Sequence, residues 1–185
     1  MTLQKQLGIL CLCCILGGNL HAQIEGAHIF SKGQSATGLG VFIHGAGPIN
    51  KADEVGGEVG VYYFAPPSLG YHMASFPLLV TFQHTFNGNG TGWYIQPGAG
   101  YSFGETDIPV FDANGIQLYN SDGTPKDQKI SGPTAALGFG YLIPSVKCPL
   151  NIGLRYEHIF VSGFPSQNMI GLRVSWSLSL ARRLK

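Results

Sequence analysis

The strongest constraint on how this chain folds is a two-residue alternation of apolar and polar side chains that recurs along most of its length. Such alternation is typical of β-strands whose two faces meet different surroundings. It predicts seven strands, at residues 38–44, 55–63, 76–85, 93–104, 133–143, 150–160 and 170–180. We expect an eighth strand at 26–31, because a closed antiparallel barrel in one chain favours an even number of strands.

The connections between these strands alternate in length. Short ones at 87–90 and 144–149, which contain Gly, Asn and Pro, alternate with longer ones at 65–75 and 105–129. The segment 45–54 departs from this order, since it is long for a tight turn. Within the longest connection, Asn114-Gly115 indicates a small hairpin at 110–119.

The apolar faces of the strands carry Leu, Ile, Val and aromatic side chains but no Lys, Arg, Asp or Glu. A charge facing lipid costs about 2–4 kcal/mol at the bilayer midplane of a membrane barrel. The opposite faces consist mainly of Gly, Ser, Thr, Gln and Ala, which fit the cramped interior of a narrow barrel. The sequence therefore predicts an all-β fold, an eight-stranded antiparallel up-and-down β-barrel that is transmembrane.

The aromatic residues of the apolar faces lie towards the strand ends, where membrane barrels carry aromatic girdles. Several strands reach 10–12 residues, which suits a tilted membrane strand of about 9–11 residues better than a globular one of about 5–6. The expected girdle consists of Tyr63, Phe76, Trp93, Phe103, Tyr141, Phe160 and Trp176.

The first 22 residues have the tripartite order of a secretory signal peptide. Lys5 precedes an apolar run at 7–16, and Gly17-Gly18 and a short polar end follow it. The run is too short to cross a bilayer, which takes about 20 residues. We expect cleavage after Ala22, which leaves a barrel domain at 23–185.

Composition excludes several other classes of protein. The formal net charge is +1, so the chain lacks the basic surplus of a nucleic-acid binder. A hydrophobic share of 44% argues against intrinsic disorder. Beyond the predicted signal peptide Cys148 is the one cysteine, so no internal disulfide can form there. Beyond the predicted signal peptide the sequence has no phosphate loop, no CxxC pair and no acidic calcium loop, so we expect no cofactor and no metal.

Four charged residues fall on the inward-facing positions and balance to zero: Glu58, Arg155, Glu157 and Arg173. Arg155 and Arg173 belong to neighbouring predicted strands. Because enclosed charges must be paired or hydrated, we expect an Arg–carboxylate network that plugs the lumen. The alternative is a gate or a narrow ion path.

A chain of this size with a signal peptide and eight alternating strands resembles the small outer-membrane barrels of the OmpA/OmpX type, over residues 26–180. The resemblance implies export to the outer membrane of a Gram-negative cell, contact with its lipid and insertion by the barrel assembly machinery. Such barrels typically end on an aromatic residue. Here Leu180 ends the last predicted strand, and Trp176 is the nearest aromatic residue.

The expected function is structural, adhesive or interactive, through the loops and above all through the loop at 105–129. Some barrels of this size hydrolyse lipid A with a His and a Ser two residues apart. Here Phe160 stands two residues after His158, and Ser162 lies two same-face steps away. No carboxylate follows His158 to orient it as a base. We therefore expect no enzyme; a hydrolase-like barrel and a secreted, lipocalin-like binder of a small hydrophobe are the alternatives.

Overall fold

The computed structural model describes residues 19–31, 34–65, 72–110, 115–144, 149–162 and 166–178. These contain β1 (Asn19–Ser31), β2 (Gln34–Pro48), β3 (Asp53–Phe64), β4 (Met73–Thr85), β5 (Gly92–Pro109), β6 (Asp127–Lys129), β7 (Gly132–Ile143), β8 (Leu150–Ile159) and β9 (Gln167–Leu178). No helix in the described part of the chain is long and apolar enough to cross a membrane.

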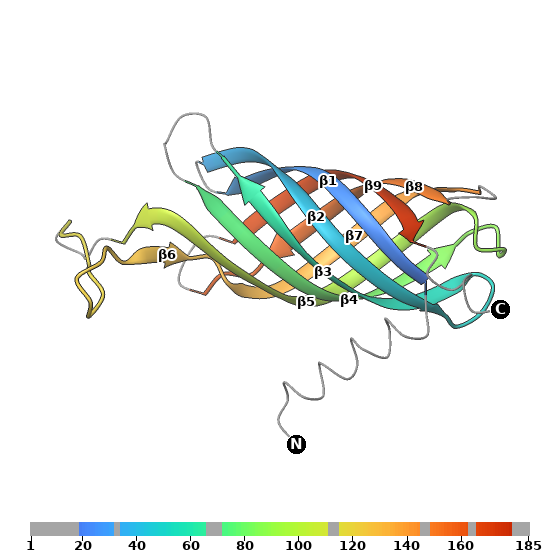
Figure 1. Ribbon diagram of the computed structural model, residues 1–185, viewed down its shortest axis with the longest axis horizontal. Helices are drawn as coiled ribbons and strands as arrows, with labels where there is room; N and C mark the ends of the chain where they lie inside the picture. The colour runs from blue at the N-terminus through green and yellow to red at the C-terminus, as the bar shows by residue number, and fades with distance from the viewer. Residues whose placement is uncertain are drawn as a thin grey trace, which may run out of the picture.

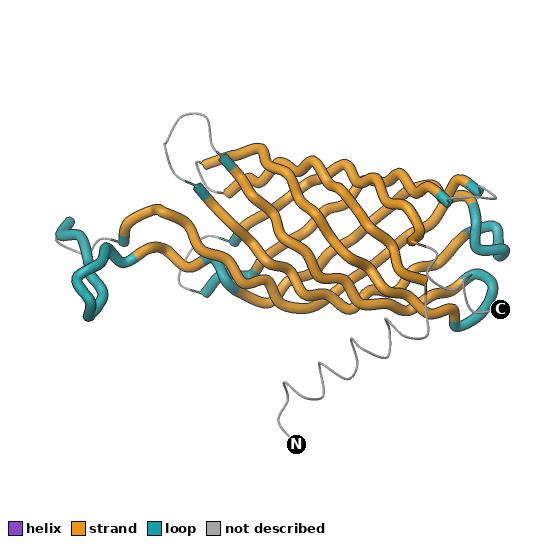
Figure 2. The backbone as a smooth tube through the Cα atoms, viewed as in Figure 1, coloured by secondary structure: helices purple, strands orange, loops and turns teal. Residues whose placement is uncertain are grey.

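Eight of the strands close into an antiparallel barrel (Figures 1 and 2). Around the ring, β1 to β5 follow one another, then β7, β8 and β9, and β9 pairs with β1. β6 pairs with the outer part of β5, where Glu105 lies opposite Lys129 and Pro109 opposite Asp127. The prediction of an eight-stranded antiparallel barrel is confirmed.

All eight predicted strands are present, and most are longer than the alternation indicated. The first strand begins at Asn19 rather than at residue 26, and its pairing with β9 closes the ring. β2 continues to Pro48 and β3 begins at Asp53, so the connection between them is the turn at 49–52. The prediction that the segment 45–54 is an unusually long connection is therefore wrong. Residues 45–48 belong to β2 and residues 53 and 54 belong to β3, so its Gly and Pro residues lie in a strand.

The two ends of the barrel differ in their connections. The turns at 49–52 and 86–91 lie at the end where β1 and β8 begin and β7 and β9 finish, which we call the short-turn end (Figure 1). The other end, which we call the loop end, carries the connections at 65–72, 110–126 and 160–166. In outer-membrane barrels, short turns face the periplasm and long loops face the outside.

Side chains alternate strictly between the lumen and the outer wall. In β8, Arg155 and Glu157 are buried whereas Leu154 and Tyr156 are exposed. Across the barrel the exposed side is aliphatic and aromatic, and most buried polar residues point inward. A lipocalin-like barrel has the reverse arrangement, with an apolar interior and a polar outer face, so the exposed apolar wall does not fit that alternative.

Inward-facing glycines leave room for the large side chains that cross the narrow lumen. A Cβ atom added at Gly40 would lie 2.6 Å from ring atoms of Phe42 and Tyr62. A Cβ atom at Gly153 would lie 2.7 Å from the hydroxyl of Tyr94. At these two positions glycine is therefore a packing requirement of the lumen.

Candidate functional site

Along its axis, the lumen contains two layers of buried side chains and then a cavity. Near the loop end, Phe64, Ile159 and Met169 belong to a buried apolar cluster. The middle holds charged side chains, described below. A cavity lies at the short-turn end, between Gly90 of one turn and Pro149 of another. The candidate functional site comprises the charged middle layer, the cavity at the short-turn end and the connections at the loop end.

Five charged side chains from four strands meet in the middle layer, and each is only 1–4% exposed. Arg155 forms ion pairs with Glu58 and with Glu157, the latter at 2.7 Å. Arg173 Nε lies 3.2 Å from Glu25 Oε2, and its Nη1 lies 3.1 Å from Glu58 Oε2. The structure thus brings all four predicted lumenal residues together, and adds a fifth.

Two neutral hydroxyl groups donate hydrogen bonds to the carboxylates of Glu25 and Glu157. The Tyr62 hydroxyl donates a hydrogen bond of 2.8 Å to Glu25 Oε1. The Ser102 hydroxyl donates one of 3.3 Å to Glu157 Oε1. Such bonds offset part of the cost of removing a carboxylate from water.

The two guanidinium groups share an aromatic neighbour. Arg155 and Arg173 lie 5.5 and 5.9 Å from the centroid of the Phe42 ring, within the range of a cation–π interaction. Arg173 also donates a hydrogen bond of 3.1 Å to Gln96 Oε1. Both arginines are therefore held by packing as well as by charge.

Glu25 is the lumenal residue that sequence reasoning missed, because the predicted first strand began one residue after it. The alternation of His21, Gln23, Glu25 and Ala27 continues into that strand and was the signal that could have found it. With Glu25 included, three carboxylates face two guanidinium groups. The formal charges of the five lumenal residues therefore sum to −1, not to zero as expected for four.

The seven predicted girdle residues all lie on the outer wall, at two levels. Six of them are 40–54% exposed, and the indole of Trp176 is half-buried. Tyr63, Phe76, Phe103 and Phe160 are near the loop end, and Trp93, Tyr141 and Trp176 are near the short-turn end. The rings of Trp93 and Tyr141 are 5.2 Å apart on paired strands. Leu180, at the end of the last predicted strand, lies outside the described residues.

The residues weighed for acyl hydrolysis do not form a triad. His158 faces outward near the loop end, where its Nδ1 lies 2.8 Å from Asn168 Oδ1. Its ring packs edge-on against Phe160, with 4.3 Å between centroids. A catalytic base is normally oriented by a carboxylate and bonded to a nucleophile, whereas the neighbours of His158 are an amide and a phenyl ring.

Between β5 and β6, the described residues 115–126 project beyond the barrel, at the far left of Figure 1. We call this projecting segment the ribbon. Val110 and Leu118 are hydrogen bonded at 2.8 Å, across the hairpin that we expected at 110–119, whose Asn114 lies outside the described residues. A second turn follows at Asp122-Gly123, where Gly123 has a φ of 82°. Hydrogen bonds from the Thr124 hydroxyl and backbone N–H lower the pKa of Asp122.

Among the residues described, no three His, Cys, Asp or Glu side chains gather closely enough to hold a metal ion.

The barrel is similar to solved structures of small outer-membrane proteins. Neisserial surface protein A (NspA) superposes with a TM-score of 0.52 at 18% identity, over 85% of this chain and 94% of that one. Ail, the attachment invasion locus protein of Yersinia pestis, gives 0.59 at 11% identity, over 88% and 99%. Its complex with the heparin analogue sucrose octasulfate gives 0.56 at 10% identity, over the same 88% and 99%. No protein-family model and no curated protein sequence matches the chain.

These similarities, with the closed ring of eight strands, define the fold of the chain as that of the small eight-stranded outer-membrane barrels.

Proposed function

We propose that this chain is an exported outer-membrane protein with a closed lumen, which acts through the ribbon at its loop end and is neither a channel nor an enzyme. The observation that carries the proposal is the filling of the lumen by two consecutive buried layers. The projecting ribbon is then the part of the molecule that is free to meet a partner.

The apolar layer near the loop end opposes the passage of ions. Tyr62 and Phe64 are fully buried, and Met169 is 1% exposed. An ion would have to leave its hydration shell to cross this layer, which is costly in an apolar surrounding. The charged layer behind it is held by mutual ion pairs, so it resembles a structural plug more than a path.

The ribbon offers acidic and apolar side chains together. The segment 105–129 contains five Asp and Glu residues against two Lys residues. Ile116 and Tyr119 are 62% and 60% exposed on it. This chemistry suits a partner with cationic groups and an apolar contact, and it disfavours a polyanion such as the heparin analogue found with Ail.

The absence of catalysis is supported by the neighbours of His158. Phe160 occupies the position two residues on where a hydrolase of this type carries its nucleophile, and Asn168 orients the ring. Altered acylation of lipid A in cells that produce the protein, lost on His158→Ala, would overturn this part of the proposal.

Membrane insertion and conduction can be measured on the same preparation. We expect the protein to stay in the membrane fraction after carbonate washing, and to migrate differently on gels with and without heating. In planar bilayers we expect no conductance steps. Steps that shift on Arg155→Ala would instead establish an ion path.

The ribbon can be tested by replacing residues 111–126 with a short Gly-Ser linker. We expect the unmodified barrel in nanodiscs to bind a poly-lysine surface more strongly than a heparin surface, and binding to weaken as salt rises. The linker variant loses Ile116, Tyr119 and two of the five acidic residues, so it should bind the poly-lysine surface more weakly than the unmodified barrel while it keeps its heat-dependent gel migration. Equal retention of the two proteins would contradict a role for the ribbon.

A further inference from the structure

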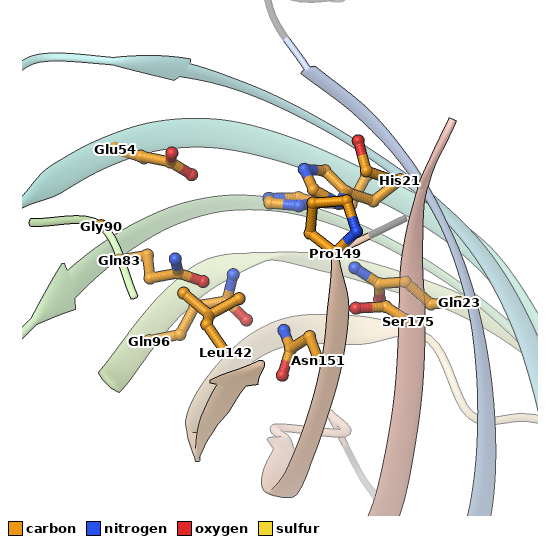
Figure 3. Close-up of a pocket in the computed structure, with 12 residues that line it drawn as sticks. His21, Gln23, Glu54, Gln83, Gly90, Gln96, Leu142, Pro149, Asn151 and Ser175 are labelled. Carbon is orange, nitrogen blue, oxygen red and sulfur yellow. The ribbon is translucent and has the colours of Figure 1, made fainter. Parts of the chain in front are cut away.

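The cavity at the short-turn end has a volume of about 180 Å³. In Figure 3 the side chains of Gln23, Gln83, Gln96 and Asn151 surround a common space. One water molecule needs about 10–15 Å³ of such a space, so the cavity is large enough for a small organic molecule, on the scale of a monosaccharide. It is separate from the ribbon, which lies at the other end of the barrel.

Gln23, one of the residues that line this cavity, carries a buried oxygen for which no described residue supplies a hydrogen bond. Gln23 is 2% exposed, and its Oε1 accepts no hydrogen bond from any described residue. An unmet buried acceptor costs about 1–3 kcal/mol. A ligand that donates a hydrogen bond to this oxygen would remove that cost.

Two neighbouring amides present donors to the same space. The Oδ1 atom of Asn151 accepts a hydrogen bond of 2.8 Å from the Tyr94 hydroxyl. The Oε1 atom of Gln96 accepts one of 3.1 Å from Arg173. Since their oxygens each accept a hydrogen bond already, the NH₂ groups are the part of these two side chains that can serve a ligand as donors.

The charge of the lining excludes some classes of ligand. Among the described residues its side chains are amides, hydroxyls, two imidazoles, a Leu, a Pro and the carboxylate of Glu54, with no Lys or Arg. Cleavage after Ala22 would add the α-ammonium of Gln23 to this lining, and a lining whose formal charges then balance favours an uncharged ligand over an ion. His21 also lines the cavity but precedes the predicted cleavage point, so the argument relies on residues that follow Ala22.

We propose that the cavity binds a small uncharged polyol of monosaccharide size, which enters from the short-turn side. Each hydroxyl of such a molecule can both donate and accept, so adjacent hydroxyls match the paired donor and acceptor of a side-chain amide. Gln23 Oε1 takes a hydroxyl proton, and the NH₂ groups of Gln96 and Asn151 bind hydroxyl oxygens. This proposal stands whether or not the ribbon has a partner.

The test is a titration of the purified barrel in detergent with D-glucose, followed by NMR chemical shifts of backbone amides. A Kd on the order of 1–10 mM is expected for a ligand of this size, with the largest shifts around the cavity. Glucose 6-phosphate serves as the charged comparison and should bind more weakly. Gln23→Leu should weaken glucose binding about 3- to 10-fold, the effect of one hydrogen bond.

The matched control is Gln167→Leu, which makes the same change at a buried glutamine near the loop end. It should leave glucose binding unchanged. If Gln23→Leu fails to fold, as judged by heat-dependent gel migration, Gln83→Leu carries the same test. The proposal is overturned if glucose produces no saturable shifts, which would mean a cavity that holds water alone. It is also overturned if glucose 6-phosphate binds at least as well, or if both substitutions have equal effects.

Discussion

Glu58 of β3 contacts both lumenal arginines, Arg155 of β8 and Arg173 of β9, from the opposite wall of the barrel. It therefore links two ion pairs that would otherwise be separate. Each arginine has a second carboxylate, Glu157 for Arg155 and Glu25 for Arg173. Glu58 is the residue on which the connectivity of the network depends.

Replacing Glu58 with Gln is expected to destabilise the barrel by about 1–3 kcal/mol, because it removes charge-assisted contacts to both arginines, while Arg155 keeps Glu157 and Arg173 keeps Glu25. Urea unfolding of the protein in lipid vesicles measures the change. Glu105→Gln, in the exposed part of β5, should change stability by less than about 0.5 kcal/mol. Equal effects of the two substitutions would show that the network adds nothing to stability.

Gly40 should not accept even a methyl group. Gly40→Ala would place a carbon 2.6 Å from the rings of Phe42 and Tyr62, and overpacking of this kind costs about 1–3 kcal/mol. Gly57→Ala is the matched control, since its nearest atom would lie 3.9 Å away. A shift of the unfolding midpoint in Gly40→Ala but not in Gly57→Ala is the expected result; similar midpoints would contradict the packing described.

A charge on the outer wall tests the membrane span directly. Leu154 is 55% exposed, so on a soluble protein Leu154→Lys would be nearly neutral. Facing lipid, it should cost about 2–4 kcal/mol. Ile116→Lys, on the ribbon, should change the free energy of unfolding in vesicles by less than about 0.5 kcal/mol. A neutral Leu154→Lys in vesicles would argue against a lipid-facing wall.

The start of the mature chain is also measurable. Cleavage after Ala22 predicts Gln23 at the N-terminus, which intact mass and N-terminal peptide analysis would show. In the structure, residues 20–22 pair with both β2 and β9, so such cleavage would shorten β1. A mature chain that begins at Asn19 or earlier would contradict the predicted boundary.

The strands, their faces and the inward position of four charges could be predicted from the sequence, because alternation is a local property of two neighbouring residues. The same alternation of apolar and polar residues also placed the girdle residues on the outer wall. The sequence pattern did not place the true end of β2, since Gly45, Gly47 and Pro48, which are typical of loops, are held in the strand by pairing with β3. The start of β1 was missed because residues 19–22 also fit the end of a signal peptide.

The partners inside the lumen were decided by the tertiary structure. Glu25 and Arg173 lie 148 residues apart in the chain and meet because β9 pairs with β1 when the ring closes. The same closure carries Glu58 to Arg155, and sets the amides of Gln23, Gln96 and Asn151 around one cavity. The sequence by itself determined which side chains point inward. Only the closed barrel decided which of them touch, because contact across a lumen depends on the register of strands far apart in the chain.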